Sequence, residues 1–470
     1  MALPSYAPRL RTALVLSGTG TAGVYHAGVL RALTEAGIKV DVVAAHGVGA
    51  IGAVSGAVDS GSHLWAADGP WMTGRAARSY RWRQSLRIAA WALGLACAVM
   101  LSPLLLILIA TAVYGAGMVA SLANLPGISS QLLNGYTRLL GLLFDPSMMP
   151  TIVPRLVVLV LLVLLGVLLV AAWQSRRGRR RRRTARGLFW WRLLGHPLDP
   201  SEPQGLAVEG MWRLTRGATG TPTPAHTEMG RRYVDLVTEN FGQPGFREVV
   251  LAVHDLDARR DLVVGLIAPQ WESAFAQRRV GAGPREAEAL NVATCAEAER
   301  GVIVDAVIAG VRLPVASAPQ EVTFPVASFW QGETHRWCDR PELVGRLIDE
   351  VARLGVEQII LVTPAPPAAV PHDMRARRVD FRHRMGETVR SVETAAFQEA
   401  WAAAASRFSG VFAIRPDHNP IGPFDFTGTY DESSDRVRTL PELMQQGYDD
   451  AYRQFIEPVV ATGERIEDGR

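Results

Sequence analysis

The fold is decided by residues 12–56, which read TALVLSGTGTAGVYHAGVLRALTEAGIKVDVVAAHGVGAIGAVSG. Residues 12–17 form a short, almost wholly apolar run that predicts a buried strand leading into a glycine-rich turn. Residues 22–36 predict a helix. A second apolar run at 39–44 predicts another buried strand, and a second glycine-rich turn leads into a predicted helix over 50–58. Strands that alternate with helices in this way predict an α/β fold with a mainly parallel sheet.

The same alternation resumes much later in the chain. We therefore expect strands from the two parts to share one mainly parallel sheet flanked by helices. The later elements are a helix at 228–241, a strand at 248–255, a helix at 341–354, a strand at 358–363 and a last helix at about 440–456.

Two long uncharged segments separate the two parts. One runs from Ile88 to Tyr114, and the other, LVVLVLLVLLGVLLVAAW, from Leu156 to Trp173. A helix needs about 20 apolar residues to cross the hydrocarbon core of a bilayer. A buried core helix is the alternative, but core helices seldom run this long without a polar face. The sequence thus predicts a two-helix transmembrane hairpin that interrupts the α/β domain.

Arginines flank this hairpin and predict its orientation. Because basic residues favour the cytoplasmic side, both chain ends are expected in the cytoplasm and residues 124–150 on the far face of the cytoplasmic membrane. Trp173 and the aromatic group Phe189, Trp190 and Trp191 suit an interface with membrane lipids, the partners we expect. The arginines form two runs, Arg75, Arg78, Arg81, Arg83 and Arg87, then Arg176, Arg177, Arg179, Arg180, Arg181, Arg182, Arg183 and Arg186.

Composition limits the other possibilities. The formal net charge of +4 depends on those thirteen arginines, so the remainder of the chain is acidic, which argues against a nucleic-acid-binding protein. The three cysteines are far apart and in no metal-ligand spacing, so we expect no disulfide framework, metal or cofactor. We divide the chain into the first part of the α/β domain (1–87), the hairpin (88–175), a basic and aromatic membrane-proximal segment (176–240), the second part of the domain (241–365) and a C-terminal region closing it (366–470).

The first glycine-rich turn, Ser17-Gly18-Thr19-Gly20-Thr21-Ala22-Gly23, permits two functions. Alone it satisfies the G-x-G-x-x-G fingerprint of dinucleotide-binding proteins. That fingerprint also needs an acidic residue at the end of the second strand, whereas Asp41 lies at its beginning. The other function is an oxyanion hole, in which backbone N–H groups receive developing negative charge.

The stretches LSGTGTAGVYHAGVLRAL and IKVDVVAAHGVGAIGA resemble the patatin-like phospholipases. The resemblance implies an oxyanion loop containing Gly18, Thr19, Gly20 and Gly23. It also implies a G-x-S-x-G nucleophile elbow at 45–49, where Gly47 takes the place of the family's serine.

The resemblance continues after the hairpin and covers roughly residues 10–60 and 240–365. VLAVHDL at 250–256 is similar to the family's strand ending in Thr-Asp-Leu, and residues 309–314 loosely resemble its Ala-Ser-x-x-x-Pro segment. By position ahead of a helix and strand, Asp339 corresponds to the aspartate of the family's catalytic dyad. Its alternative role is to cap the following helix.

The reaction of this family needs a serine hydroxyl, and Gly47 has none. Ala22 replaces a basic loop residue, and Arg340 and Pro341 replace the glycines after the aspartate. An elbow residue has a positive φ, which glycine adopts readily, so the turn is expected to survive without the nucleophile.

The sequence therefore predicts an integral-membrane patatin-like protein that is inactive as a serine acyl hydrolase and binds lipid or a partner. The alternative is an active lipid hydrolase with another nucleophile, for which His46, Ser17, Thr19 and Thr21 are candidates. Structural roles for these four side chains are also open. The polar residues at 415–420 and Asp425 are explained by turn chemistry or by a further site.

Overall fold

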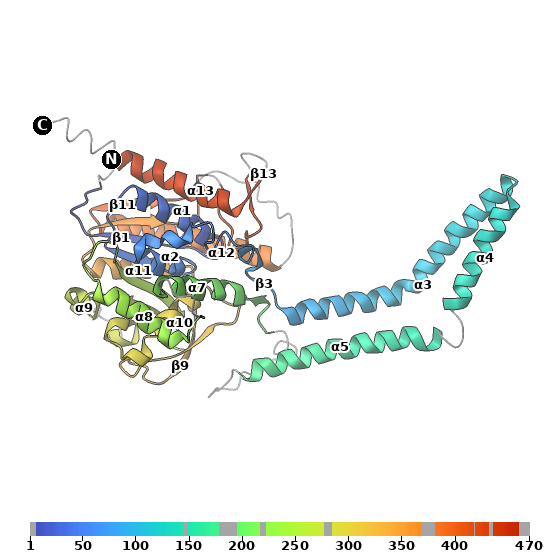
Figure 1. The fold of residues 1–470 in the computed structure, drawn as a ribbon, viewed down its shortest axis with the longest axis horizontal. Helices are drawn as coiled ribbons and strands as arrows, with labels where there is room; N and C mark the ends of the chain where they lie inside the picture. Colours follow the sequence, from blue (N-terminus) through green and yellow to red (C-terminus); the bar gives the residue numbers. More distant parts are fainter. Residues whose placement is uncertain are drawn as a thin grey trace. The chain divides into compact units, whose positions relative to one another are not determined.

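The computed structural model describes residues 6–143, 149–177, 195–216, 222–276, 284–367, 381–417, 419–431 and 436–459. The second arginine run beyond Arg177, and Phe189, Trp190 and Trp191, lie outside the described residues. The chain forms two compact units (Figure 1). We call Met1–Arg81 with Leu198–Arg470 the α/β unit, and Trp82–Pro197 the helical unit.

One sheet of nine strands runs through the described part of the α/β unit. Five neighbouring strands, in the order β11-β10-β1-β2-β5, are all parallel, as the sequence predicts. β6 pairs with β5 and β8 with β9, and β9 pairs with the end of β5, all antiparallel, while β7 runs parallel to β6. The strands are β1 (Thr12–Leu16), β2 (Val42–Ala45), β5 (Glu248–Asp255), β6 (Arg260–Leu266), β7 (Ala289–Asn291), β8 (Gln320–Thr323), β9 (Thr334–Cys338), β10 (Gln358–Val362) and β11 (Gly410–Ile414).

At the centre of this sheet, the two strands from before the helical unit, β1 and β2, lie between β10 and β5 from after it. Leu14 of β1 aligns with Val43 of β2 on one side and with Ile360 of β10 on the other. All five residues of β1 are buried. The predicted sharing of one sheet by the two parts of the chain is thus confirmed.

Helices cover both faces of the sheet, because these strands are apolar on both sides. On one face, Ala13, Val15 and Val42 belong to a core that includes the buried sides of α11 and α12. On the other face, Gly52 of α2 lies against Leu16. The covering helices are α11 (Leu343–Arg353) and α12 (Phe381–Ala405) on the first face, and α1 (Ala22–Glu35), α2 (Gly49–Gly56) and α10 (Val302–Gly310) on the second.

The last helix, α13 (Leu440–Ala451), packs closely along α1 (Figure 1). The contact depends on two glycines. A Cβ at Gly28 would lie 1.8 Å from the carbonyl oxygen of Met444, and one at Gly447 would lie 2.3 Å from that of Tyr25. The C-terminal region therefore closes the same α/β unit.

The remaining elements of the α/β unit are three helices, two small sheets and several turns. They are α7 (Ser201–Thr215), α8 (His226–Glu239), α9 (Pro269–Ala276), the two-stranded sheets of β3 (Arg81–Trp82) with β4 (Leu198–Asp199) and of β12 (Thr429–Asp431) with β13 (Arg436–Arg438), the 3₁₀ turns Asp59–Leu64, Ala76–Arg78, Arg285–Ala287, Val292–Thr294 and Glu297–Glu299, and a π-helical turn at Tyr452–Ile456.

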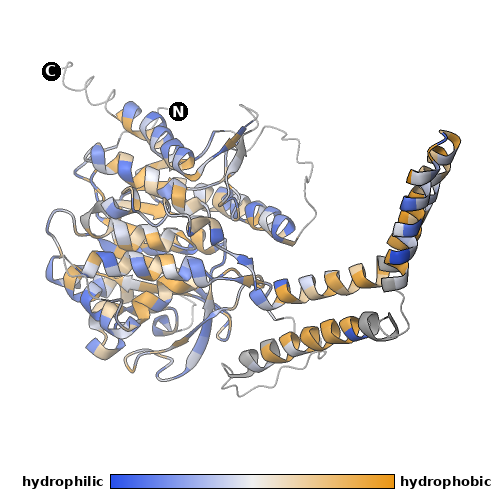
Figure 2. Ribbon diagram, turned by 45° about the vertical axis from the view of Figure 1, so that its right-hand side comes forward, coloured by the Kyte–Doolittle hydropathy of each residue, from blue (hydrophilic) through white to orange (hydrophobic). Residues whose placement is uncertain are grey.

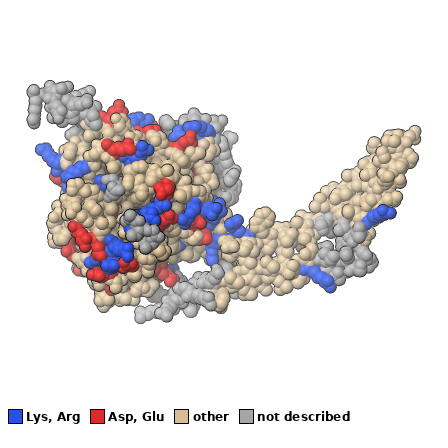
Figure 3. All heavy atoms as spheres, in the orientation of Figure 1, with Lys and Arg blue, Asp and Glu red and all other residues tan. Residues whose placement is uncertain are grey.

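The helical unit consists of α3 (Gln84–Leu122), α4 (Pro126–Leu143) and α5 (Met149–Arg177). α3 and α5 are mainly hydrophobic, whereas α4 is mixed (Figure 2). Described side chains of the unit include few charges (Figure 3). Two stretches of α3, Gln84–Leu101 and Leu104–Leu122, are long and apolar enough to cross a membrane, and α5 contains a shorter apolar stretch, Arg155–Val170.

This arrangement differs from a simple two-helix hairpin. The 39 residues of α3 rise about 58 Å, nearly twice the ~30 Å hydrocarbon core. A third helix, α4, follows the turn at Asn124, whose φ is +55°, and pairs with α3. The Tyr136 hydroxyl donates to the carbonyl of Leu106 at 2.7 Å. The sequence pattern missed α4 because its apolar residues are interrupted by polar ones and by Arg138.

Candidate functional site

Two turns lie side by side at the carboxyl edge of the sheet. The first joins β1 to α1 through Ser17–Gly23, which we call the glycine loop, and the second joins β2 to α2 through residues 46–48, which we call the elbow. Because β1 and β2 are parallel neighbours, both turns open at the same edge, where open α/β sheets bind ligands. The Val48 N–H donates to the Gly18 carbonyl at 3.1 Å, so the turns are in direct contact.

Gly47 has φ +60°, the conformation expected of an elbow residue. A Cβ placed on it would lie 2.3 Å from the Gly18 carbonyl oxygen and 2.9 Å from Asp339 Oδ2. The space a side chain would need is therefore already taken by these two oxygens. Asp339, which follows β9, lies beside the elbow although it is 292 positions further along the chain.

Asp339 does not cap the following helix. The N-cap of α11 is Glu342, and the Asp339 N–H donates to the Arg312 carbonyl at 2.9 Å. Its side chain is 1% exposed and belongs to the site. The neighbouring Arg340 turns to Asp261 instead, at 3.0 Å.

A buried chain of polar groups links the two turns to Asp339. Ser17 Oγ lies 2.9 Å from His46 Nε2, and His46 Nδ1 lies 3.0 Å from Asp339 Oδ1. The Thr19 hydroxyl lies 3.4 Å from Asp339 Oδ2 and 2.5 Å from Glu393 Oε1 on α12. All five residues are at most 4% exposed. We call Ser17, Thr19, His46, Asp339 and Glu393 the polar cluster.

The protonation state of Glu393 determines which groups of this cluster donate hydrogen bonds and which accept them. Burial, with a smaller effect of the Asp339 charge, raises the pKa of the Glu393 carboxyl to about 7. A protonated Glu393 would donate to the Thr19 oxygen, leaving the Thr19 hydrogen for Asp339. His46 Nδ1–H would then donate to Asp339 and the Ser17 hydroxyl to His46 Nε2. In this arrangement every donor of the cluster has an acceptor.

His26, on α1, contacts the backbone of the glycine loop at Ser17. Its Nε2 lies 3.1 Å from the Ser17 carbonyl oxygen, to which an Nε2–H donates. Burial lowers the pKa of His26 to about 4, so the ring is neutral at pH 7. Its role is to hold the backbone of Ser17.

The C-terminal part of the chain covers the glycine loop. The Thr21 N–H donates to the Pro423 carbonyl at 3.3 Å, and a Cβ on Gly20 would lie 1.9 Å from that oxygen. The covering segment is itself anchored by the Ile421 N–H, which donates to the Pro364 carbonyl at 3.1 Å. We call Ile421–Phe426 the cover loop. It and Glu393 of α12 close the glycine loop from solvent.

The other sequence candidates are placed as follows. Gly18 adjoins Gly47, and Gly23 packs against Trp71 and Val48. Asp425 accepts from the Gly422 N–H at 3.0 Å, as turn chemistry predicts. Glu393 was not predicted, because only the fold shows that α12 reaches the glycine loop.

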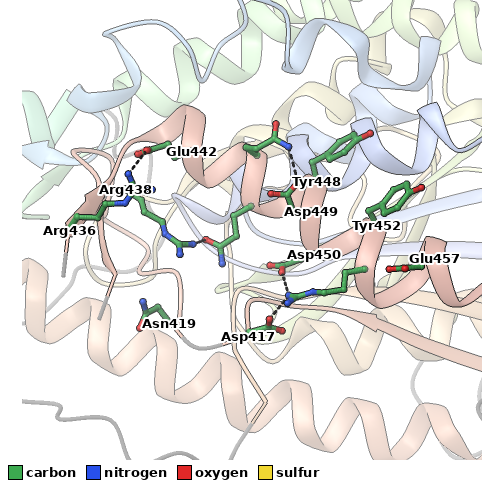
Figure 4. A pocket seen from close by; sticks show the side chains of 13 residues that line it. Asp417, Asn419, Arg436, Arg438, Glu442, Tyr448, Asp449, Asp450, Tyr452 and Glu457 are labelled. Atoms are coloured by element: carbon green, nitrogen blue, oxygen red, sulfur yellow. Dashed lines mark hydrogen bonds and ion pairs between the residues drawn. The ribbon is translucent and has the colours of Figure 1, made fainter. Parts of the chain in front are cut away.

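A surface pocket of about 1010 Å³ lies elsewhere, beside α13 and β13 (Figure 4). None of the residues that line it belongs to the polar cluster. Several of its charges are paired with one another, as in Arg453 with Asp417 and Asp450, and Arg436 with Glu442. This pairing leaves the carboxyl edge of the sheet as the candidate site.

Fold and site define a mainly parallel α/β protein with a glycine elbow facing a buried aspartate. No protein-family model matches the sequence, and no curated protein matches it. Among solved structures, the chain is similar to the crystal structure of VipD from Legionella pneumophila, with a TM-score of 0.33 and 12% identity, covering 97% of this chain and 67% of that chain.

Proposed function

We propose that this chain is a membrane-anchored, patatin-like protein that does not hydrolyse acyl esters at its elbow and instead holds an acyl lipid. The observation that carries the proposal is the closed elbow. Gly47 has no hydroxyl, and the Gly18 carbonyl and the Asp339 carboxylate occupy the space of a side chain. An elbow serine typically accounts for about 10⁶ in rate, so its loss removes the reaction while the turn remains.

The anchoring part of the proposal rests on the helical unit. Leu104, Leu108, Met118 and Leu122 of α3 are more than half exposed. A continuous apolar surface of this extent is unfavourable in water and is explained by contact with lipid. The flanking arginines favour the cytoplasmic side for the α/β unit.

The catalytic part is tested with the full chain purified in detergent. Release of fatty acid from dioleoyl phosphatidylcholine in mixed micelles should be the same for the unaltered protein and for Asp339→Asn. Turnover that Asp339→Asn removes and Ser17→Ala retains would show an elbow-type reaction and overturn the proposal.

The binding part is tested separately with a photoreactive diacyl phosphatidylcholine in dioleoyl phosphatidylcholine vesicles. Crosslinks should include the cover loop or α12, which border the glycine loop, as well as α3. Crosslinks confined to the helical unit would contradict lipid binding at the site.

A further inference from the structure

The hydroxyl missing from the elbow has a counterpart 30 positions earlier, at Ser17. Ser17 Oγ lies 2.9 Å from His46 Nε2, and His46 Nδ1 lies 3.0 Å from Asp339 Oδ1. These are the hydrogen-bond distances that a hydroxyl–imidazole–carboxylate relay requires. The order of the atoms is also correct, because the hydroxyl meets one ring nitrogen and the carboxylate the other. We propose that Ser17, His46 and Asp339 form a relocated acyl-accepting site, in which Ser17 becomes esterified by the lipid's acyl group.

Acyl transfer also requires hydrogen-bond donors for the developing oxyanion, and the glycine loop supplies them. Among the described residues, no acceptor is found for the backbone N–H groups of Gly18, Thr19 and Gly20. The hydroxyl of Thr21, which is fully buried, also has no partner there. Buried donors without acceptors are rare and indicate a ligand oxygen at this position.

The reaction balances with the residues present. Ser17 Oγ forms a bond to the ester carbonyl carbon while His46 Nε2 takes the hydroxyl proton, and Asp339 stabilises the imidazolium. The bond from that carbon to the alcohol oxygen then breaks, and His46 returns the proton to the departing alcohol. The products are acyl-Ser17 and a free alcohol.

The acyl group would remain on Ser17, because hydrolysis needs water at a site whose serine is 4% exposed. The inference thus deepens the proposed function and rests on it: the acyl group of one lipid is held covalently on Ser17 and is not turned over. Entry requires displacement of the cover loop, whose Phe424 ring packs on Tyr80 with centroids 5.8 Å apart.

The test uses the full chain in detergent and a fluorophosphonate probe, followed by intact mass and peptide mapping. We expect one label per chain, on Ser17, and none in Ser17→Ala. Ser55→Ala is the matched control, because Ser55 is a second buried serine bonded to a histidine ring, His63, at 3.2 Å, and it should label normally.

Two further variants test the relay and the cover. His46→Gln should slow labelling by about 100-fold or more, the usual contribution of a general base. Phe424→Ala should accelerate it by loosening the cover loop. Absence of label on Ser17 in both the unaltered protein and Phe424→Ala would overturn the inference and leave the proposed function standing. Labelling with repeated turnover of lipid would instead overturn the proposed function.

Discussion

At the scale of single residues, the elbow is shaped for glycine in two independent ways. The φ of +60° at Gly47 costs an L-residue roughly 1 kcal/mol or more. The approach of the Gly18 carbonyl to 2.3 Å from a Cβ adds a steric cost that a backbone shift must relieve. Replacing Gly47 by serine therefore requires a backbone shift at the elbow as well as a new hydroxyl.

The first prediction follows. Gly47→Ser and Gly47→Ala should both lower the free energy of unfolding, by on the order of 2–4 kcal/mol, since they share the same Cβ. Gly37→Ala separates strain from crowding, because Gly37 has φ +65° but no neighbour within 4 Å of its Cβ. Gly37→Ala should therefore lower the free energy of unfolding by less than Gly47→Ala does. Urea denaturation monitored by tryptophan fluorescence measures the free energy of unfolding of all three variants. An unchanged midpoint in Gly47→Ala would contradict the steric conflict between a Cβ at position 47 and the Gly18 carbonyl.

Glu393 gives a prediction on pH. Its folded pKa of about 7 lies above its ordinary value of 4.5, so the folded state holds the proton more tightly. The associated stabilisation is fully present below about pH 4.5 and is lost as the pH rises through about 7.

Glu393→Gln should therefore remove most of the loss of stability between pH 5 and pH 8, on the order of 3 kcal/mol for a shift of this size. The exposed-side control is Glu387→Gln on the same helix, where Glu387 pairs with His383 at 3.1 Å. Denaturant midpoints at the two pH values provide the measurement. A Gln variant that keeps the full pH dependence of the unaltered chain would exclude Glu393 as its source.

At the scale of elements, close helix contact places the C-terminal region where it can cover the site. Gly28 and Gly447 let α1 and α13 approach until backbone meets backbone. Pro423 and Glu393 then meet a glycine loop whose position is fixed by β1 and α1. The C-terminal region thus contacts the rest of the α/β unit both along α1 and at the glycine loop.

We predict that Gly28→Ala lowers the free energy of unfolding by at least about 2 kcal/mol, because a Cβ at 1.8 Å from the Met444 carbonyl forces the helices apart. Gly345→Ala on α11 is the control, since nothing lies within 4 Å of its Cβ. That change should stabilise the protein by up to about 1 kcal/mol through helix propensity. Equal midpoints for the two variants would argue against the close crossing.

The elements show what the sequence could and could not predict. Short apolar runs identified β1, β2, β5 and β10 within three residues, because buried parallel strands carry a strong local signal. The strands β6 to β9, which form the mixed part of the sheet, were not predicted, because they are short or partly exposed and lack that signal. Asp339 could be proposed from its place before a helix and strand. The contacts of Ser17 with His46 and of Thr19 with Glu393 could not be proposed, because they depend on the register between elements.

At the scale of the whole molecule, the arginines that flank the helical unit predict how the chain is oriented in the membrane. Both chain ends are expected in the cytoplasm, with α4 reached from the far side. In a Cys97→Ser background, Gly135→Cys should react with an impermeant maleimide added outside cells. Glu239→Cys, exposed at the end of α8, should react only after the cytoplasmic side is opened. Labelling of Gly135→Cys from the cytoplasm alone would reverse the orientation.

The position of the helical unit in the chain also dictates the order of events during synthesis. Thr12 of β1 must pair with Gln358 of β10, 346 positions later, and β2 must wait for β5 beyond the helical unit. At the usual 5–20 residues per second, the open edge of β2 stays unpaired for roughly ten seconds or more, and that of β1 for roughly twenty seconds or more. Exposed strand edges favour aggregation, so a nascent chain of this protein has to be shielded by a chaperone or by the membrane insertion machinery until translation of β10 is complete.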